Sequence, residues 1–478
     1  GSLYRNGPGK YELGEKSYFH LFDGLACVHK YAIKDGRVTY YNKLLDTLIF
    51  KRAIAENRLY PVFGTADVCS NVFGRLKSMY VRSDLLDNVN VNVVPYADQH
   101  LYALTETNMM CRLDPNDLSV LEKINITDAI PSARSTIAHP HVDRDGSWIT
   151  MGMNLSDKKA PRYEFIRYRG GKEALTAENA TKNAELICSL GSSNPGALSY
   201  FHSFGLTDNY IVFIEQSMLF SLKDYLLAML KNQPFSAALI KKEKMPARIH
   251  LIEKRTGKIV DKKFITDPFI IFHHINAYET TDDNNKSIVI DLCTYDPHHF
   301  DINALSYEGF VSEKTLNQLP LKAMASRVVV PLGEGTSSKD TYCKLNRMHN
   351  VSFELPTINY DRFNGRKYKY TYAVNMHSSP LSIVKLNMDD PMDYKERKYA
   401  DGDGAKELPS EPVFVERPGA SSEDDGVLLV MVLADQNDFL SVLDAKTLEE
   451  IGRAELPAEA RGSFTFHGFF FSGREFYL

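Results

Sequence analysis

Four of the fourteen histidines in this chain stand in apolar or turn-like sequence frames beside predicted strand ends. The first three follow one another at intervals of about 65 residues, and the fourth comes after about three more such intervals. Neutral imidazole binds zinc, copper, iron and nickel, so these side chains could form a metal site without specifying the metal. The spacing typical of structural zinc sites and the HExxH motif are both absent. The four candidate ligands are His139 in Ala138-His-Pro-His141, His202 in Tyr200-Phe-His-Ser-Phe-Gly205, His273 in Ile271-Phe-His-His-Ile-Asn276 and His467 in Phe464-Thr-Phe-His-Gly468.

The elements that must position these histidines are short runs rich in Val, Ile, Phe and Tyr, bounded by turns rich in Asp, Asn and Gly. Many such strands without regularly alternating helices predict an all-β fold, with a sandwich, a barrel or a propeller as candidates. One inward histidine per unit of about 65 residues suits a circular array, and the chain would provide roughly seven units. We expect one domain over residues 1–478; a seven-bladed propeller would let His467 meet the other three histidines at the axis, with a sandwich and a barrel as the alternatives. The clearest strand segments are 209–215, 287–292, 327–331, 428–433 and 439–443.

Composition narrows the classes of partner. The formal net charge is −5 and no basic tail or strongly basic region is visible, which argues against nucleic acid. The six cysteines are scattered without a CxxC pair, a usage that fits a reducing compartment rather than a disulfide framework. The longest wholly apolar run, Val427 to Ala434, is far shorter than the ~20 residues that span a bilayer.

Two segments depart from the strand pattern. After Ser221, apolar side chains recur with the spacing of an amphipathic helix, and Ser221 with Asp224 resembles a capping box. This helix could pack on the core or, with the basic residues that follow it, dip into a membrane surface. The segment from Asp67 to Tyr80 mixes Cys69 with apolar and basic residues, and it could also be an ordinary surface loop and helix.

Around these histidines the sequence resembles the carotenoid cleavage oxygenases, a family that includes β-carotene oxygenases, apocarotenoid dioxygenases and a retinoid isomerohydrolase. The similar motifs occur in the same order along nearly the whole chain. They are Arg5-Asn-Gly-Pro-Gly9, His20-Leu-Phe-Asp-Gly24, Phe63-Gly-Thr65, Thr105-Glu-Thr-Asn108, Ala138-His-Pro-His141, His202-Ser-Phe-Gly-Leu-Thr-Asp-Asn-Tyr210, Phe272-His-His-Ile-Asn-Ala-Tyr-Glu279, Phe353-Glu-Leu-Pro-Thr-Ile-Asn-Tyr360, Ser410-Glu-Pro-Val-Phe414, Glu423-Asp-Asp-Gly426 and Phe466-His-Gly468.

The resemblance implies a seven-bladed propeller with a helical cap and membrane-facing insertions, holding one non-haem Fe(II) through four histidines. The implied ligands are His139, His202, His273 and His467, which leaves two octahedral positions open for O2 or water. His141 and His274, the second members of the two doublets, are then not ligands. Three outer glutamates would each accept the free ring N–H of one ligand. With a dication and four neutral imidazoles, the three carboxylates would give the whole centre a net charge of −1. These glutamates are Glu106, Glu354 and Glu411.

The segments 221–239 and 248–260 resemble most the insect carotenoid isomerooxygenases. This resemblance implies cleavage of a C40 carotenoid (β-carotene, zeaxanthin or lutein) at its 15,15′ double bond, with isomerisation of one half. The products would be all-trans and 11-cis retinal or a hydroxylated retinal, which points to vitamin A and visual chromophore supply. The alternatives are a 15,15′-dioxygenase or apocarotenoid dioxygenase without isomerase activity, a retinoid isomerohydrolase, and a non-catalytic carotenoid-binding propeller.

A carotenoid dissolves in membranes, so the resemblance also implies docking on a bilayer through segments 67–79 and 218–236. The expected location is cytoplasmic and peripherally membrane-associated. Cys69 matches a position of lipid attachment in a relative, although an unmodified thiol is the alternative.

Overall fold

The computed structural model describes residues 1–67, 86–97, 99–157, 159–282, 285–311, 321–333, 340–399 and 407–472. Strands account for 48% of the structure and helices for 10%, so the prediction of a mostly β fold is confirmed. Each of the five strand segments predicted from the sequence overlaps an observed strand. The predictions for Cys69 and for nearly all of segment 67–79 fall outside the described residues.

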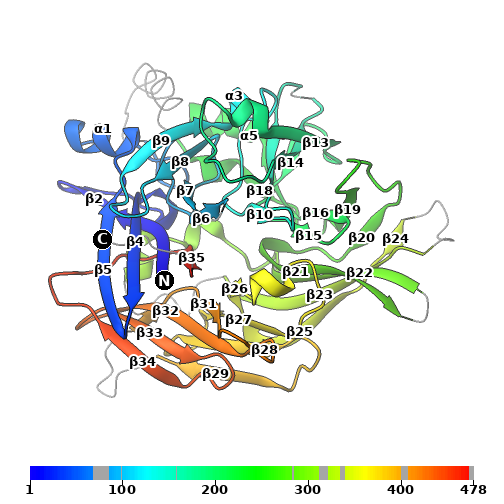
Figure 1. Cartoon of the computed structure of the whole chain (residues 1–478). Coiled ribbons are helices and arrows are strands. Elements are labelled where there is room, and N and C mark those ends of the chain that lie inside the picture. The colour runs from blue at the N-terminus through cyan, green and yellow to red at the C-terminus, as the bar shows by residue number, and fades with distance from the viewer. Residues whose placement is uncertain are drawn as a thin grey trace.

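The described residues form seven sheets of four or five strands, and Figure 1 shows these sheets following one another around the centre of the molecule. The first sheet joins strands from both ends of the described chain: β35 (His467–Phe471), β1 (Ser2–Lys10), β4 (Leu25–Lys34) and β5 (Arg37–Leu44). The second contains β6 (Asn92–Tyr96), β7 (His100–Leu104), β8 (Met109–Leu113) and β9 (Val120–Asn125). The third contains β10 (His141–Val142), β11 (Trp148–Asn154), β12 (Arg162–Tyr168) and β13 (Ala184–Gly191).

The remaining large sheets are antiparallel apart from the pair β20 and β24, which is parallel. The fourth contains β15 (Gly205–Leu206), β16 (Tyr210–Glu215), β19 (Ala247–Glu253), β20 (Phe264–Thr266) and β24 (Thr341–Tyr342). The fifth contains β21 (Ile270–Asp282), β22 (Asn285–Tyr295), β23 (Ala323–Pro331) and β25 (Leu345–Ser352). The sixth contains β26 (Glu354–Thr357), β27 (Tyr370–Asn375), β28 (Ser382–Asn387) and β29 (Tyr394–Lys398). The seventh contains β30 (Glu407–Pro409), β31 (Val413–Glu416), β32 (Gly426–Ala434), β33 (Phe439–Asp444) and β34 (Glu450–Glu455).

Small sheets and short helices decorate this framework. The small sheets are β14 (Ala197–Ser199), β17 (Met218–Ser221) and β18 (Leu239–Lys241), and β2 (Glu12–Leu13) with β3 (Lys16–Ser17). The α-helices are α1 (Leu48–Glu56), α3 (Ile126–Ala129), α4 (Ala180–Asn183), α5 (Leu222–Leu230), α6 (Tyr307–Val311) and α7 (Tyr360–Phe363). The 3₁₀ helices are η1 (Leu21–Asp23), η2 (Phe235–Ala238) and η3 (Ile302–Ala304).

Apolar side chains are buried between neighbouring sheets, because each sheet has two faces to cover. A separate buried cluster joins each sheet to the next in chain order, from the first through the seventh. A further cluster joins the seventh sheet back to the first, since Leu3 and Tyr31 share it with Leu429 and Met431. The hydrophobic packing therefore runs in a cyclic order, although no single hydrogen-bonded sheet within the described part of the chain closes on itself.

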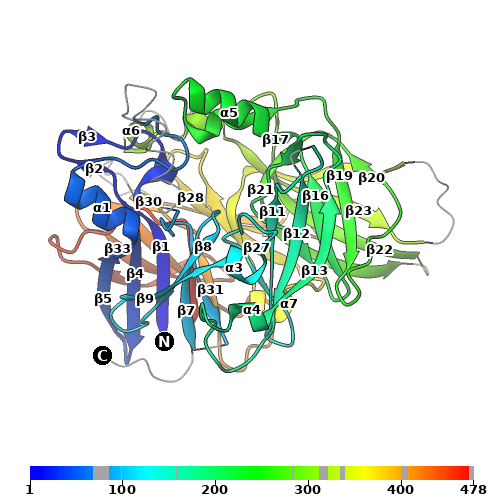
Figure 2. The same cartoon turned by 90° about the horizontal axis from the view of Figure 1, so that it is seen from above.

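Helix α5 confirms the helix predicted after Ser221, and the Ser221 hydroxyl accepts the N–H of Asp224 at 3.3 Å as its cap. The apolar residues of this helix lie on two sides of it, one facing the core and one facing outwards. Ala228 is buried, whereas Leu226 and Leu230 are 48% and 73% exposed. Figure 2 shows α5 at the edge of the molecule, on the side that also carries β17.

A buried carboxylate ties the third sheet to the fourth, and His202 lies in the segment of chain between these two sheets. Glu215 on β16 accepts hydrogen bonds from the Tyr163 hydroxyl at 3.0 Å and from His250 Nε2 at 3.0 Å. Burial raises the pKa of Glu215, but the hydrogen bond and attraction of His250, with the Ser193 N–H, outweigh it and lower the pKa to about 2.

The low pKa of Glu215 predicts that part of the free energy of unfolding depends on pH. A carboxyl with a lower pKa in the folded than in the unfolded state stabilises the fold above its unfolded pKa, by about 3 kcal/mol here. That share is lost as the pH falls from about 5 towards 2. We expect Glu215→Gln to lower the free energy of unfolding in urea at pH 7, and the difference from wild type to narrow at pH 4. A difference that does not change with pH would contradict the assignment.

Candidate metal centre

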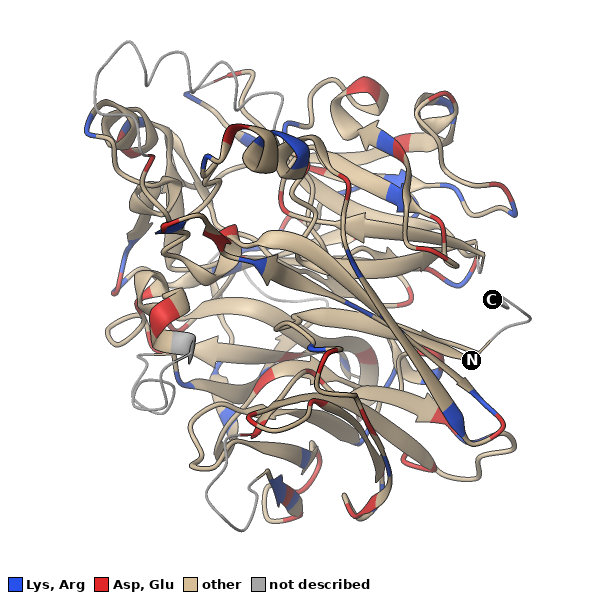
Figure 3. Cartoon of the chain, turned by 90° about the vertical axis from the view of Figure 1, so that its left-hand side faces the viewer, with Lys and Arg blue, Asp and Glu red and all other residues tan. Residues whose placement is uncertain are grey.

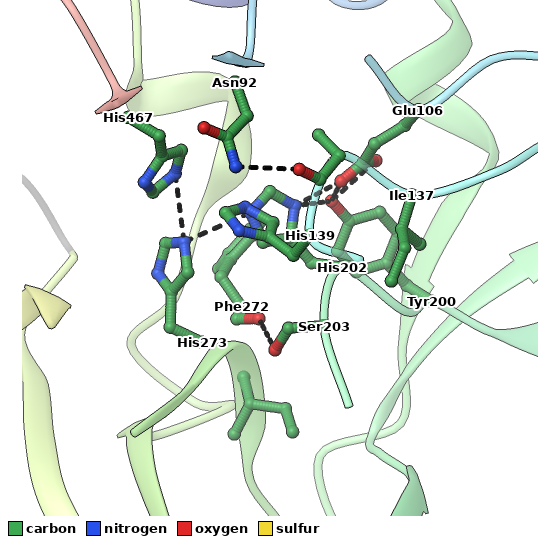
Figure 4. A network of polar contacts seen from close by, with 12 residues as sticks. Asn92, Glu106, Ile137, His139, Tyr200, His202, Ser203, Phe272, His273 and His467 are labelled. Carbon is green, nitrogen blue, oxygen red and sulfur yellow. Dashed lines mark hydrogen bonds and ion pairs between the residues drawn. The ribbon is translucent and has the colours of Figure 1, made fainter. Parts of the chain in front are cut away.

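The structure brings together the four histidines predicted as ligands. Their ligand nitrogens all lie within 4.8 Å of one another, and His202, His273 and His467 are buried. Nε2 of His202 lies 2.9 Å from Nε2 of His139 and 3.2 Å from Nε2 of His273, which is 3.3 Å from Nε2 of His467. Figure 4 shows these rings pointing at one another from separate segments of the chain.

Backbone contacts hold the segments that carry these rings. The Asn92 side chain donates to the carbonyl of Ala138 at 2.8 Å and so fixes the loop that presents His139. The Ser203 hydroxyl donates to the carbonyl of Phe272 at 2.7 Å, which ties the segment of His202 to β21, where His273 lies. His467 begins β35 and pairs with Asn6 of β1. The relative positions of the rings are therefore set by contacts between different sheets (Figure 4).

The three predicted glutamates also lie where the sequence resemblance places them. Glu106 Oε1 is paired with Nδ1 of His202, Glu354 Oε2 lies 2.6 Å from Nδ1 of His273, and Glu411 Oε1 lies 2.8 Å from Nδ1 of His467. A carboxylate beside Nδ1 accepts its N–H and so fixes the tautomer that leaves Nε2 as a bare lone pair. Within the described part of the chain, His139 has no such carboxylate partner.

This donor set fits a metal ion. With Nδ1 as donor, the Nε2 atoms of His202, His273 and His467 direct only lone pairs towards one another, which repel at these distances unless a cation lies among them. Two nitrogens bound to one metal at right angles, with bonds of about 2.1 Å, would lie about 3 Å apart. The observed separations of 2.9 to 3.3 Å match this value.

The protonation states agree with metal binding, which requires neutral imidazole. Burial, reinforced by repulsion from His467 and the other ring nitrogens, holds the pKa of His139 well below its ordinary value. Burial likewise lowers the pKa of His467 to about 4, against the opposing attraction of Glu411. Both rings are therefore neutral at pH 7.

The second histidine of each doublet faces away from the cluster. His141 Nδ1 lies 2.8 Å from the Tyr360 hydroxyl, and His274 Nδ1 lies 2.9 Å from the Ser203 hydroxyl. Neither belongs to the group of converging ligand nitrogens. This arrangement agrees with the sequence prediction that His139 and His273, rather than their neighbours, are the ligands.

Sequence reasoning missed three residues that hold the outer carboxylates. The Tyr200 hydroxyl donates to Glu106 at 2.9 Å, and the Tyr295 hydroxyl donates to Glu354 at 2.7 Å. The fully buried Arg5 forms an ion pair with Glu411 at 2.6 Å. The signal for Arg5 was its place in a family-like motif, but nothing in the sequence paired it with a glutamate. Its charge corrects the expected net charge of the centre from one negative to zero when a dication is bound.

The cluster lies in the wall of a large cavity of about 600 Å³, within the range of roughly 300–1,000 Å³ usual for ligand pockets. The cavity wall is mostly apolar and includes Phe22, Phe63, Tyr200, Phe272 and Phe466. The inner side of α5 contributes Tyr225, Ala228 and Met229. A large apolar ligand would thus contact three of the four converging histidines, His202, His273 and His467, directly.

One buried carboxylate shapes part of this wall. Asp23, which is 1% exposed, accepts the backbone N–H groups of Val62 and Phe63 on one oxygen, at 2.8 and 2.6 Å. Its other oxygen accepts those of Gly64 and Thr65, at 2.8 and 2.6 Å. Gly64 packs against the His20 ring so closely that an added Cβ would lie 2.3 Å from it. Asp23 thereby fixes a loop of which Val62 and Phe63 line the cavity.

The outer glutamates predict a metal-affinity effect that can be separated from folding. Glu354→Gln removes the charged acceptor of the His273 N–H, and we expect metal affinity to fall about 10–100-fold. Glu215→Gln is a matched control, because it also removes a buried carboxylate that contacts a histidine. Glu215 Oε2 lies 3.0 Å from Nε2 of His250, which is outside the cluster. Equilibrium titration with Co²⁺ would measure both variants. Equal metal affinities for Glu354→Gln and wild type would contradict the assigned role.

Comparisons with known proteins agree with this geometry. The family model described as retinal pigment epithelial membrane protein matches residues 1–472. The human mitochondrial carotenoid-cleaving dioxygenase is 33% identical, with 98% of this chain and 86% of that protein covered. The chicken beta,beta-carotene 15,15'-dioxygenase is also 33% identical, covering 98% of this chain and 92% of that protein.

Solved structures show the same fold. The cobalt-substituted apocarotenoid oxygenase of Synechocystis superposes with a TM-score of 0.78 at 23% identity, covering 98% of this chain and 91% of that one. None of the described helices is long and apolar enough to cross a membrane. Because the family model spans nearly the whole chain and relatives above 30% identity cover 98% of it, this chain belongs to the carotenoid oxygenase family of the retinal pigment epithelial membrane protein.

Proposed function

We propose that this protein is an Fe(II)-dependent dioxygenase that cleaves a C40 carotenoid at the 15,15′ double bond and isomerises one half to the 11-cis form. One observation carries the proposal: four imidazoles converge, and three of them, His202, His273 and His467, line an apolar cavity of about 600 Å³. Imidazole suits iron as well as other transition metals, and the relatives named as dioxygenases favour oxygen chemistry over a structural metal.

Fe(II) would supply the activation of O2, and His139, His202, His273 and His467 would hold it. The chain's own residues perform the other tasks. Glu354 and Glu411 keep the Nδ1 protons in place and make the rings stronger donors. The apolar wall binds the polyene and excludes water, while aromatic faces such as that of Phe272 can stabilise positive charge along the chain.

The test is incubation of the iron-loaded protein with β-carotene, zeaxanthin or lutein under O2, followed by chromatography of the aldehydes. Equal amounts of an all-trans and an 11-cis aldehyde are expected. All-trans aldehydes alone would contradict the isomerase activity and indicate a dioxygenase that does not isomerise. If apocarotenals, offered as a separate substrate, are the only compounds cleaved, the protein is an apocarotenoid dioxygenase. Hydrolysis of a retinyl ester would favour an isomerohydrolase. Bound carotenoid without product would indicate a binding protein.

We also propose that the protein docks on membranes through the outer face of α5, within segment 218–236, together with segment 67–79. Leu226, Leu227 and Leu230 project from this helix and are 48%, 41% and 73% exposed, while its inner side lines the cavity. A carotenoid could therefore pass from the bilayer to the cavity beside the same helix. On the side of the molecule drawn in Figure 3, charges of both signs are interspersed rather than gathered into one basic surface.

The docking proposal predicts that Leu226→Glu with Leu230→Glu weakens sedimentation with phosphatidylcholine vesicles, because charge opposes insertion of the helix face. Turnover of substrate presented in detergent should stay unchanged. The matched control is Met392→Glu with Ile451→Glu, which charges two residues that are 87% and 59% exposed, the first in the turn between β28 and β29 and the second on β34. The proposal fails if both double variants bind vesicles as wild type does, or if both lose binding equally.

We infer that the seven large sheets are the blades of one propeller domain over residues 1–478, a reading supported by the cyclic order of the buried clusters. A reducing compartment such as the cytoplasm agrees with the five described cysteines, which are all free. The primate and ferret relatives, however, are named as mitochondrial proteins, so fractionation of cells that express the protein would test its location.

A further inference from the structure

We propose that Arg5 is a positioning residue that makes metal binding at His467 depend on the pairing of β1 with β35. The proposal rests on the metal centre proposed above. Arg5 lies on β1, His467 lies on β35, and the two strands pair in register with Arg5 opposite Gly468 and Asn6 opposite His467.

The guanidinium of Arg5 contacts two residues of the segment that presents His467 and the carboxylate of Glu411. Its Nη1 donates to Glu411 Oε2 at 2.6 Å, its Nη2 donates to the carbonyl of Phe466 at 3.1 Å, and its Nε donates to the Thr465 hydroxyl at 3.3 Å. The side chain is 0% exposed. A planar fork of donors fixed in this way holds both the backbone before His467 and the carboxylate beside it.

Glu411 transmits this contact to the ring. One of its oxygens accepts from Arg5, and the other lies 2.8 Å from Nδ1 of His467. The backbone N–H of Gly468 also donates to Glu411, at 3.2 Å. Gly468 itself has no room for a side chain, because an added Cβ would lie 2.0 Å from the carbonyl oxygen of Tyr4 on β1. His467 is thus held against β1 in two ways, by its ring through Glu411 and Arg5 and by the close packing of Gly468 against Tyr4.

The other two outer carboxylates are held differently. Neutral tyrosine hydroxyls donate to Glu106 and Glu354, and no cation is paired with either among the residues that the structure describes. Of the four described ligands, His467 alone is supported by a carboxylate whose charge is balanced by a buried cation from another strand. Removing that cation leaves the buried charge of Glu411 without an ion-pair partner. Solvation by water would then favour movement of the carboxylate away from the ring.

The experiment compares Arg5→Met, Arg5→Lys and wild type by titrating the metal-free protein with Co²⁺ and recording its visible absorption. We expect Arg5→Met to weaken Co²⁺ binding at least 10-fold and to change the Co²⁺ spectrum. Arg5→Lys keeps the charge but not the fork, so its loss should be smaller. The matched control is Arg327→Met, which breaks another Arg–carboxylate pair, Arg327 with Asp291 at 2.7 Å, away from the cluster.

A double-mutant comparison distinguishes positioning through Glu411 from general destabilisation. In a Glu411→Gln background, Arg5→Met should cause a smaller further loss of Co²⁺ affinity than it causes in wild type, because only its contacts with Thr465 and Phe466 then change. In a Glu354→Gln background the full loss should remain. Wild-type affinity in Arg5→Met, an equal loss in Arg327→Met, or full additivity with Glu411→Gln would each overturn the proposal. If Arg5→Met does not fold, Arg5→Lys is combined with Glu411→Gln and with Glu354→Gln, and the Co²⁺ affinities of these double variants are measured instead.

The outcomes also separate this proposal from the proposed function. Normal Co²⁺ binding by wild type without carotenoid cleavage after iron loading would contradict the function and leave the role of Arg5 standing. Carotenoid cleavage by wild type with undiminished Co²⁺ binding by Arg5→Met would contradict the role of Arg5 alone.

Discussion

Replacing His273 with alanine is expected to abolish metal binding and carotenoid turnover while leaving most of the fold intact. The ring is one of four converging ligands, and its Nε2 lies 3.2 Å from that of His202 and 3.3 Å from that of His467. Loss of a ligand should exceed the roughly 100-fold cost that removal of an outer hydrogen-bond partner can reach. Metal analysis of the purified variant and product chromatography would measure the two effects.

The neighbouring histidine provides the control for this experiment. His274→Asn keeps a polar atom near Nδ1, which lies 2.9 Å from the Ser203 hydroxyl, and removes a ring that is outside the ligand group. Its metal content should equal that of wild type. Retention of metal by His273→Ala together with its loss in His274→Asn would reverse the assignment within the doublet.

Asp23→Asn should lower the free energy of unfolding more than Glu215→Gln does. The carboxylate accepts four backbone N–H groups, and an asparagine amide would direct N–H donors against two of them. Hydrogen bonds to a charged group contribute about 1.5–3 kcal/mol each, so we expect a loss of roughly 3–5 kcal/mol. Urea unfolding of the metal-free protein would measure it.

A matched substitution isolates the effect of these four hydrogen bonds. Asp46→Asn makes the same change of charge at an exposed position nearby in the sequence and should alter stability by less than about 0.5 kcal/mol. Because the Asp23 loop carries Val62 and Phe63 into the cavity wall, Asp23→Asn should also weaken carotenoid binding more than it weakens metal binding. Equal stabilities of the two variants would show that the carboxylate does not hold the loop.

The four converging histidines could be singled out from the sequence by their apolar or turn-like frames and their spacing, whereas their role as ligands was implied by the family resemblance. Histidines at similar intervals in similar frames suit repeated units, and the strands between them have clear patterns of β-branched and aromatic residues. The outer glutamates required the family resemblance, because a lone glutamate beside a strand end looks like a surface charge. Glu354 and Glu411 proved to have side chains only 5% and 10% exposed.

The partners of those residues could not be predicted. Arg5 and Glu411 are separated by 406 residues, and they meet because the seventh sheet, whose strands β30 and β31 flank Glu411, packs against the first sheet. Asp23 and the loop that it holds both belong to motifs visible in the sequence, but nothing there shows that one receives the N–H groups of the other. The division of the apolar residues of α5 between two sides likewise depends on where the cavity lies.

The position of His467 also has a consequence for synthesis of the protein. During translation, a nascent chain carries three of the four imidazoles once residue 273 has left the ribosome, and 194 more residues must follow before the fourth is available. Arg5 precedes Glu411 by 406 residues, so their ion pair cannot form until all of that stretch has been synthesised. Ribosome-bound intermediates that end before residue 467 therefore lack the complete set of four converging imidazoles.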